Sequence, residues 1–283
     1  MLSLHTNNAA LSAQNSITRT QNQLSTSMTR LSTGFRINSA MDDAAGLQIA
    51  TRLKAQTSGM TVAMSNTQNS TSMLQTAEGA FDEVTNMLIR MKDLATQAAD
   101  ASSGAKDKTA MQSEYDALGL ELSNVMKNTT FGGNKLLVGG TLASSMTFQI
   151  GASQSETMAF DVSAKMTSLV ASLTSATANY AATAGGSELT SSANATIALL
   201  ETAIGDVGTV RSALGAAANR LDHVNTNLSN IATNTKAATG RIMDVDFATE
   251  SSNMTSSQML LQAGTAMLKQ SNSMSSMVMS LLQ

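Results

Sequence analysis

Apolar residues recur every seven positions near both ends of this sequence, and this repeat limits the fold more than any other feature. Near the N-terminus the apolar positions are separated by seven, four, three and four residues, and they are Ile17, Leu24, Met28, Leu31 and Phe35. In the second half an unbroken column consists of Leu200, Val207, Leu214, Leu221 and Leu228. Such spacing places apolar side chains on one narrow face of a helix that packs against another helix. Both halves therefore predict long, paired helices.

The chain contains no Pro among its 283 residues, so no residue interrupts a helix by removing a backbone donor. Steps of three and four residues continue from about residue 44 to residue 98, which is typical of a coiled-coil rod. We expect the first helix to end at Gly34, because Gly tolerates the left-handed conformation. Asp42 and Asp43 supply capping oxygens for a second helix that begins near Ala44.

Between the two helical halves the apolar period changes. Alternation with polar residues involves Met146, Phe148 and Ile150, and then Met158, Phe160 and Val162. This pattern predicts a β-hairpin, with residues 151–155 as its connection. Residues 166–190 are rich in Ser, Thr and Ala and include Gly185-Gly186. We interpret them as an exposed tip loop.

After Gly240 the predicted last helix carries two adjacent apolar columns. The first column is Phe247, Met254, Leu261, Leu268 and Leu282, and the second is Leu260, Met267, Met274 and Leu281. A thin rod of two helices cannot cover both columns, and full burial of a Leu- or Met-sized side chain is worth roughly 1.5–3 kcal/mol. Contacts between copies of the chain would cover the remainder, and head-to-tail contacts that do not close by rotation form open helical polymers. Taken alone, such columns favour burial in an intramolecular core over contacts between copies of the chain.

Composition excludes several other classes of protein. A net charge of −3 leaves no basic stripe for nucleic acid, and no run of 18 apolar residues is present to span a membrane. The absence of Cys excludes disulfides and thiolate metal sites. His5 and His223 lack the partners that a metal site or a catalytic dyad requires. We therefore expect no enzyme, no cofactor and no metal. The N-terminus also lacks the features of a cleavable secretory signal peptide.

Two segments resemble the terminal hallmarks of bacterial flagellins. The first runs from Leu31 to Leu47 (LSTGFRINSAMDDAAGL), and the second runs from Gly240 to Glu250 (GRIMDVDFATE). Further similarity follows at residues 262–265 and 280–282, so the resemblance covers roughly residues 1–140 and 195–283. It implies a structural subunit that polymerises into the extracellular flagellar filament for motility. It also implies export without a cleavable signal peptide, and its partners would be further copies, the export apparatus, an export chaperone, the filament cap and hook-junction proteins.

The resemblance implies a mainly α fold, in which the N- and C-terminal segments pair as long antiparallel coiled-coil helices, with a small β-hairpin region and a short central loop. Residues 1–43 and 241–283 would form an inner core domain. Residues 44–165 and 191–240 would form a rod domain, and residues 166–190 the variable tip loop. Two alternatives are a hook–filament junction protein of the same coiled-coil design and a secreted helical adhesin or immune ligand.

Two sets of residues follow from this resemblance and from the apolar columns. The subunit-assembly residues are expected to be Leu24, Met28, Leu31, Leu260, Leu261, Met267, Leu268, Met274 and Leu281. The residues that match the pattern recognised by a vertebrate Toll-like receptor are Arg90, Leu94, Gln97 and Glu114. Ile89 departs from the Gln that is usual in this pattern, and a solvated helix face that packs on a neighbouring subunit is the alternative interpretation of the segment. For the inner rod, an intramolecular core is the better interpretation.

Overall fold

A computed structural model of the protein describes residues 7–181 and 185–281, with side chains to residue 274. The chain divides into two compact units. Residues 1–56 and 233–283 form the first, which we call the terminal unit, and residues 57–232 form the second, the central unit. Two long helices, α2 (Ala44–Ala99) and α6 (Ala193–Met243), contribute residues to both units. Helices dominate the described residues, which confirms the prediction of a mainly α fold.

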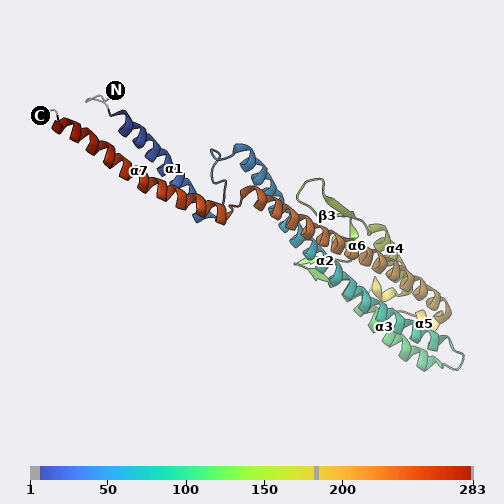
Figure 1. The fold of residues 1–283 in the computed structure, drawn as a ribbon. Coiled ribbons are helices and arrows are strands. Elements are labelled where there is room, and N and C mark those ends of the chain that lie inside the picture. The colour runs from blue at the N-terminus through green and yellow to red at the C-terminus, as the bar shows by residue number, and fades with distance from the viewer. Residues whose placement is uncertain (1–6, 182–184, 282–283) are drawn as a thin grey trace. The chain divides into compact units, whose positions relative to one another are not determined.

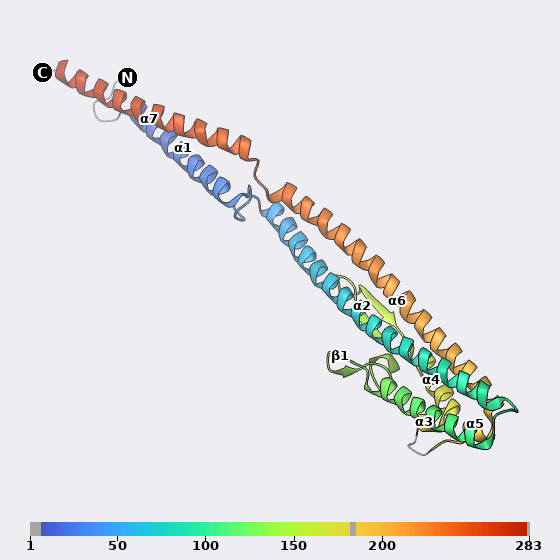
Figure 2. The ribbon, with the colours of Figure 1, turned by 90° about the horizontal axis from the view of Figure 1, so that it is seen from below.

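In the terminal unit, α1 (Asn8–Thr33) and α7 (Phe247–Leu281) lie side by side in both views (Figures 1 and 2). The amide of Asn7, at the start of α1, donates a hydrogen bond of 3.2 Å to the Ser271 carbonyl far along α7. Arg30, near the end of α1, lies 3.8 Å from Glu250 in the first turn of α7. The two helices are therefore antiparallel, as the sequence predicts.

The ends of these helices have the expected caps. The Asn7 side chain accepts a hydrogen bond from the Ala10 N–H at 3.1 Å at the start of α1. Gly34 ends α1 in the left-handed conformation, with φ of 77°, and its N–H donates to the Arg30 carbonyl. This confirms the predicted helix end, because a left-handed residue is where Gly is favoured.

The core of the central unit lies between α2, α3 (Ala105–Asn128), α4 (Ser163–Ala176) and α6. Its fully buried side chains include Phe81, Met91, Leu122, Leu169 and Leu200. The α6 column that begins at Leu200 is buried along its whole length, which confirms the interpretation of this column as an intramolecular core. Arg211 on α6 binds Glu78 on α2 at 2.8 Å and Asp82 at 3.1 Å.

Two antiparallel hairpins lie in the central unit. Strands β1 (Thr130–Phe131) and β2 (Asn134–Lys135) are joined by two glycines with positive φ, which suits a tight hairpin turn. Strands β3 (Met146–Gln149) and β4 (Thr157–Phe160) pair with Met146 opposite Phe160, and this confirms the predicted hairpin. The short 3-10 helix η1 (Thr141–Ala143) lies between the two hairpins in sequence.

The prediction of an exposed tip loop is wrong for much of residues 166–190. This stretch contains most of α4, the 3-10 helix η2 (Ala178–Tyr180) and the start of α5 (Glu188–Ser191), while residues 182–184 lie outside the described residues. Met166, Leu169, Leu173 and Ala176 are buried. Their spacing of three, four and three residues places them on one helix face, so α4 packs into the core although Ser and Thr dominate its other face.

A network of hydrogen bonds connects the segment around α5 to α3. The Gln112 amide donates to Asp116 at 2.7 Å and to Glu188 at 2.8 Å, and its oxygen accepts from the Leu189 N–H at 2.7 Å. Asn179 also donates to Asp116, at 2.6 Å. Because Gln112 is buried and all its bonding groups have partners, the network holds this segment against the core.

Candidate assembly surface

The segments that follow α1 and precede α7 bond directly to each other. Gly34 accepts a hydrogen bond of 3.0 Å from the Val245 N–H, and the Arg36 N–H donates to the Met243 carbonyl at 2.6 Å. The Arg36 guanidinium also donates to the Ile242 carbonyl at 2.8 Å. These residues belong to the two segments singled out in the sequence, at 31–47 and 240–250. Segments more than 200 positions apart thus form one antiparallel bridge, centred on Phe35 and Asp244.

Three aspartates organise the ends of these connecting segments. Asp43 accepts from the Gly46 N–H at 2.8 Å and caps α2, as predicted. Asp42 does not cap this helix, because it accepts instead from the Ser39 and Asn38 N–H groups, and these bonds lower the pKa of its carboxyl below 3.8. Asp246 caps α7.

The pKa of Asp246 is lowered by the same kind of contact. The hydroxyl of Thr249 donates to its carboxylate at 2.7 Å and has the largest effect, followed by the Ala248 N–H at 3.0 Å. Hydrogen bonds to the ionised form stabilise it relative to the protonated form. The cap at the start of α7 is therefore stronger when this carboxylate is deprotonated.

The described side chains of α1 and α7 form no apolar core of their own. Among the described side chains of α1 and α7, the buried ones are polar: Ser27, Glu250 and Ser257. Glu250 pairs with Arg30. Two helices alone cover each other along a single seam, so their apolar side chains remain partly in water. The pair of helices therefore has an apolar surface that a further helix or another protein chain could cover.

The two apolar columns of α7 have different surroundings. In the first column Met254, Leu261 and Leu268 are half-buried and belong to the seam with α1, whereas Phe247 at the start of α7 is 56% exposed. The other column points away from the seam, and its exposed fractions are 60% for Leu260, 68% for Met267 and 54% for Met274. We call these three residues the outer column. The side chain of Leu281, the fourth predicted member, lies outside the described residues.

The predicted residues of α1 divide in the same way. Leu24 and Leu31 are half-buried in the seam, whereas Met28 is 56% exposed. Ile17, which is also in the seam, lies close to Gly264, where an added Cβ atom would be 2.9 Å from Ile17 Cγ1. The structure thus separates residues that pair α1 with α7 from residues that this pairing leaves uncovered.

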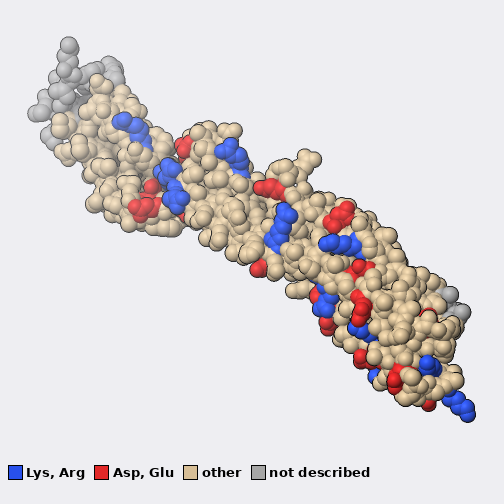
Figure 3. All heavy atoms as spheres, turned by 90° about the vertical axis from the view of Figure 1, so that its right-hand side faces the viewer, with Lys and Arg blue, Asp and Glu red and all other residues tan. Residues whose placement is uncertain are grey.

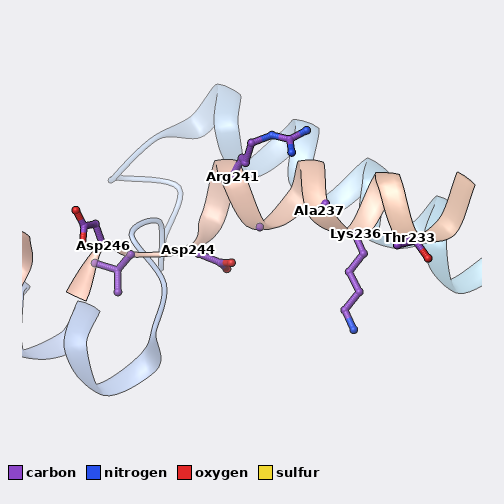
Figure 4. Close-up of a pocket in the computed structure, with 8 residues that line it drawn as sticks. Thr233, Lys236, Ala237, Arg241, Asp244 and Asp246 are labelled. Atoms are coloured by element: carbon purple, nitrogen blue, oxygen red, sulfur yellow. The ribbon is translucent and has the colours of Figure 1, made fainter. Parts of the chain in front are cut away.

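Two shallow hollows lie on the terminal unit. One follows the exposed face of α1 and is lined by Gln21, Leu24, Ser25, Met28, Thr29, Ser32 and Thr33. The other lies at the end of α6, where Lys236 and Asp244 extend toward the same side and Arg241 extends away (Figure 4). Both are open to solvent, unlike the enclosed pockets that bind small molecules.

Other kinds of site find little support in the described part of the chain. It contains no group of three or more His, Asp or Glu side chains that could hold a metal ion. None of its helices combines the length and apolarity that crossing a bilayer requires. On the face shown in Figure 3, positive and negative side chains are interspersed. Several of them pair, such as Lys92 with Glu201 at 2.9 Å.

The segment with the receptor pattern lies on α2 and α3. Arg90 donates from two guanidinium nitrogens to Glu114 Oε1, at 2.8 and 2.6 Å, and both residues are exposed, as is Gln97. Leu94 is only 2% exposed and belongs to the core, so it offers little surface to a receptor in this structure. Leu94 is covered by residues of neighbouring helices, and the sequence of α2 alone does not show where those helices pack.

The fold and this surface define a class of protein: a helical structural subunit whose chain ends pair and leave an apolar face uncovered. Comparison with known families agrees. Residues 4–141 match the bacterial flagellin N-terminal helical region, and residues 197–282 match the bacterial flagellin C-terminal helical region. Polar flagellin F of Vibrio parahaemolyticus is 34% identical over 376 residues, with 99% of each chain covered. Flagellin A of Vibrio cholerae is 33% identical over 380 residues, with both chains fully covered.

This chain belongs to the bacterial flagellin family. It is a structural subunit of the flagellar filament, which is an extracellular polymer of such subunits. This result confirms the function predicted from the sequence, and it does not favour the hook–filament junction protein or the secreted adhesin or immune ligand. A solved structure of a flagellar hook-associated protein from Vibrio parahaemolyticus has a TM-score of 0.58 at 16% identity, covering 72% of this chain and 100% of the other, and shows likeness of fold alone. The alignments with the Vibrio flagellins are longer than this chain, so those relatives carry residues without a counterpart here.

Proposed function

We propose that the outer column of α7, together with Met28 of α1, is the surface that neighbouring subunits bury when the filament grows. The observation that supports this assignment is the contrast between the two columns of α7. Met254, Leu261 and Leu268 of the first column are half-buried, whereas the outer column is more than half exposed although its residues are as apolar. Large apolar side chains that remain exposed in a row commonly mark an interaction surface.

The seam residues have a different role in this proposal. Leu24, Leu31, Leu261 and Leu268 hold α1 against α7 and so present the outer column in one orientation. Because the pair buries no apolar side chain among its described residues, pairing alone yields little stability. Ordering of the chain ends is therefore coupled to assembly, which covers both helices further. Repetition of this contact head to tail, without closure, produces a filament.

Deletion of residues 260–283 tests this function. We expect the truncated protein to keep the helices of the central unit and to remain monomeric in seeded polymerisation, followed by electron microscopy. A matched control is Val62→Ser, which removes an apolar side chain of similar exposure from the central unit and should leave filaments intact. Filaments of normal length from the truncated protein would overturn the assignment.

Further roles follow from the family and are part of the same proposal. The subunit is exported by the flagellar export apparatus without cleavage of a signal peptide, after binding to an export chaperone. The filament cap and the hook-junction proteins then contact the same chain ends, residues 1–43 and 241–283. The chain has no catalytic activity in this scheme. Mass spectrometry of the secreted protein should find the N-terminal peptide uncleaved by a signal peptidase.

A second candidate function is recognition by a vertebrate Toll-like receptor. The exposed ion pair of Arg90 and Glu114, with exposed Gln97 on the same helix as Arg90, supports it. Ile89 is also exposed, where the recognised pattern has Gln. A reporter assay in receptor-expressing cells should show a weaker response to Arg90→Ala than to the unchanged protein, and a stronger response to Ile89→Gln. Equal responses from all three would refute receptor recognition through this segment.

A further inference from the structure

Methionine is the main target for mild oxidants in this chain. The sequence has 20 Met but neither Cys nor Trp. A thioether is oxidised to a sulfoxide by peroxides, and a thiol would otherwise compete for the same oxidant. Oxidative chemistry at neutral pH is therefore concentrated on methionine sulfur, and the exposure of each methionine decides where it occurs.

The exposed methionines gather on the terminal helices. Among the described side chains, the exposed methionines are Met28, Met41, Met259, Met267 and Met274. All of these except Met41 lie on α1 or α7. In contrast, the central unit has no exposed methionine among its described residues, and Met91 and Met126 there are fully buried. Met28, Met267 and Met274 thus lie on the surface where subunits are proposed to meet, Met259 adjoins it in sequence, and Met41 lies outside it.

We propose that Met28, Met259, Met267 and Met274 form a reversible oxidation site that controls whether a subunit can assemble. This inference rests on the proposed function, because it places the site on the surface that assembly covers. Met259 is included because it precedes Leu260 of the outer column and is itself exposed. We call the four residues the outer methionines.

The oxidant is a peroxide, and the reaction balances with one sulfur atom. The thioether sulfur attacks one peroxide oxygen, an S–O bond forms, the O–O bond breaks, and the leaving hydroxide takes up a proton to give water. Sulfur loses two electrons and the peroxide gains them. A methionine sulfoxide reductase reverses the change, with two thiols oxidised to a disulfide while the sulfoxide oxygen leaves as water.

Oxidation makes the assembly surface more polar, and this change opposes its burial between subunits. A sulfoxide carries a strongly polar oxygen, and burial of a polar group without a hydrogen-bond partner is unfavourable. Leu260, in the same column, cannot undergo this reaction, so the chemistry depends on the methionines alone. Once a neighbouring subunit covers the outer methionines, the oxidant no longer reaches them. Free subunits are therefore sensitive, and subunits within a filament are protected.

The test uses the full-length chain and one set of matched variants. The outer methionines are replaced together by Leu, which keeps a similar apolar volume. The control variant is Met41→Leu, which removes the most exposed methionine that lies outside α1 and α7. Subunits of all three proteins are treated with hydrogen peroxide, peptide mass spectrometry locates the sulfoxides, and light scattering follows elongation from filament seeds.

Oxidised wild-type and Met41→Leu subunits should elongate at least about tenfold more slowly than untreated ones, as expected from a loss of binding of one order of magnitude. Treatment with reductases for both sulfoxide epimers should restore the rate, and the four-Leu variant should keep its rate after peroxide. Preformed filaments should show fewer sulfoxides at the outer methionines than free subunits.

Two results would overturn the proposal. One is normal elongation by wild-type subunits with sulfoxide at all four positions, and the other is an equal loss of rate in the four-Leu variant. Failure of the proposed function would be seen separately, without oxidant, if replacing the outer column with Ser left assembly unchanged. If Ser replacement abolishes assembly while oxidation has no effect, the surface is correct and the oxidation site is wrong.

Discussion

Replacement of the outer column by serine measures how much assembly free energy this surface supplies. The variant carries Leu260→Ser, Met267→Ser and Met274→Ser. These side chains are 54–68% exposed in the isolated subunit. Full burial of a side chain of this size is worth roughly 1.5–3 kcal/mol, so covering the exposed part contributes about 1–2 kcal/mol per residue. The three together supply about 3–5 kcal/mol to each subunit that joins a filament.

This free energy sets the concentration at which filaments form. Each 1.4 kcal/mol corresponds to a factor of about ten in an equilibrium constant, so the critical concentration should rise by about two to three and a half orders of magnitude. It is measured by sedimenting filaments at equilibrium and assaying the subunits left in the supernatant. Circular dichroism should show that the central unit keeps its helices, since none of the three residues belongs to its core.

The matched control removes the same number of exposed apolar side chains from the central unit. Val62→Ser, Leu120→Ser and Ile231→Ser change residues that are 42–58% exposed. We expect the critical concentration of this variant to rise by less than about tenfold. The reasoning is refuted if the outer-column variant also stays below tenfold, or if the control variant matches it.

Four further substitutions test predictions about stability. Gly208→Ala should raise the free energy of unfolding by about 0.5–1 kcal/mol, because the added Cβ meets open space in a helix. Gly119→Ala should lower it by about 1–3 kcal/mol, because the added Cβ would lie 2.7 Å from a buried threonine hydroxyl. Urea unfolding measures both changes. Tyr115→Phe leaves the Ala176 carbonyl without its buried donor and should cost about 1–3 kcal/mol in the same assay. The lowered pKa of Asp246 stabilises the terminal unit at pH values above 3.8, and this contribution is lost as the pH falls through the lower pKa of the folded state. Asp246→Asn should therefore lose less helical circular dichroism than wild type on acidification, and identical acid profiles would contradict this assignment.

Local signals in the sequence predicted most of the helices. The end at Gly34 and the cap at Asp43 depend on residues within one turn, which a linear pattern reveals directly. The β3–β4 hairpin followed from alternation in the same way. The α4 helix was missed because its composition is rich in Ser and Thr, although the spacing of Met166, Leu169 and Leu173 carried the signal.

The surroundings of each apolar column could not be predicted from the pattern alone. The two columns of α7 have the same period, so spacing does not tell which one α1 covers. That choice depends on the close approach at Gly264 and on the polar pair of Arg30 and Glu250, which are contacts between distant segments. Leu94 shows the same limit, because its burial comes from neighbouring helices and not from its own.

The bridge between Gly34–Arg36 and Met243–Val245 has a consequence for the order in which a new subunit folds. One side of the bridge is available early in the chain, but its partner comes more than 200 residues later. A polypeptide that is synthesised or delivered from its N-terminus can therefore close this joint only after nearly all of it has arrived. A product cut short before residue 243 has an N-terminal helix but no partner for it. A chain that lacks residues 243–245 therefore cannot form this bridge, and its first helix has no second helix to pair with.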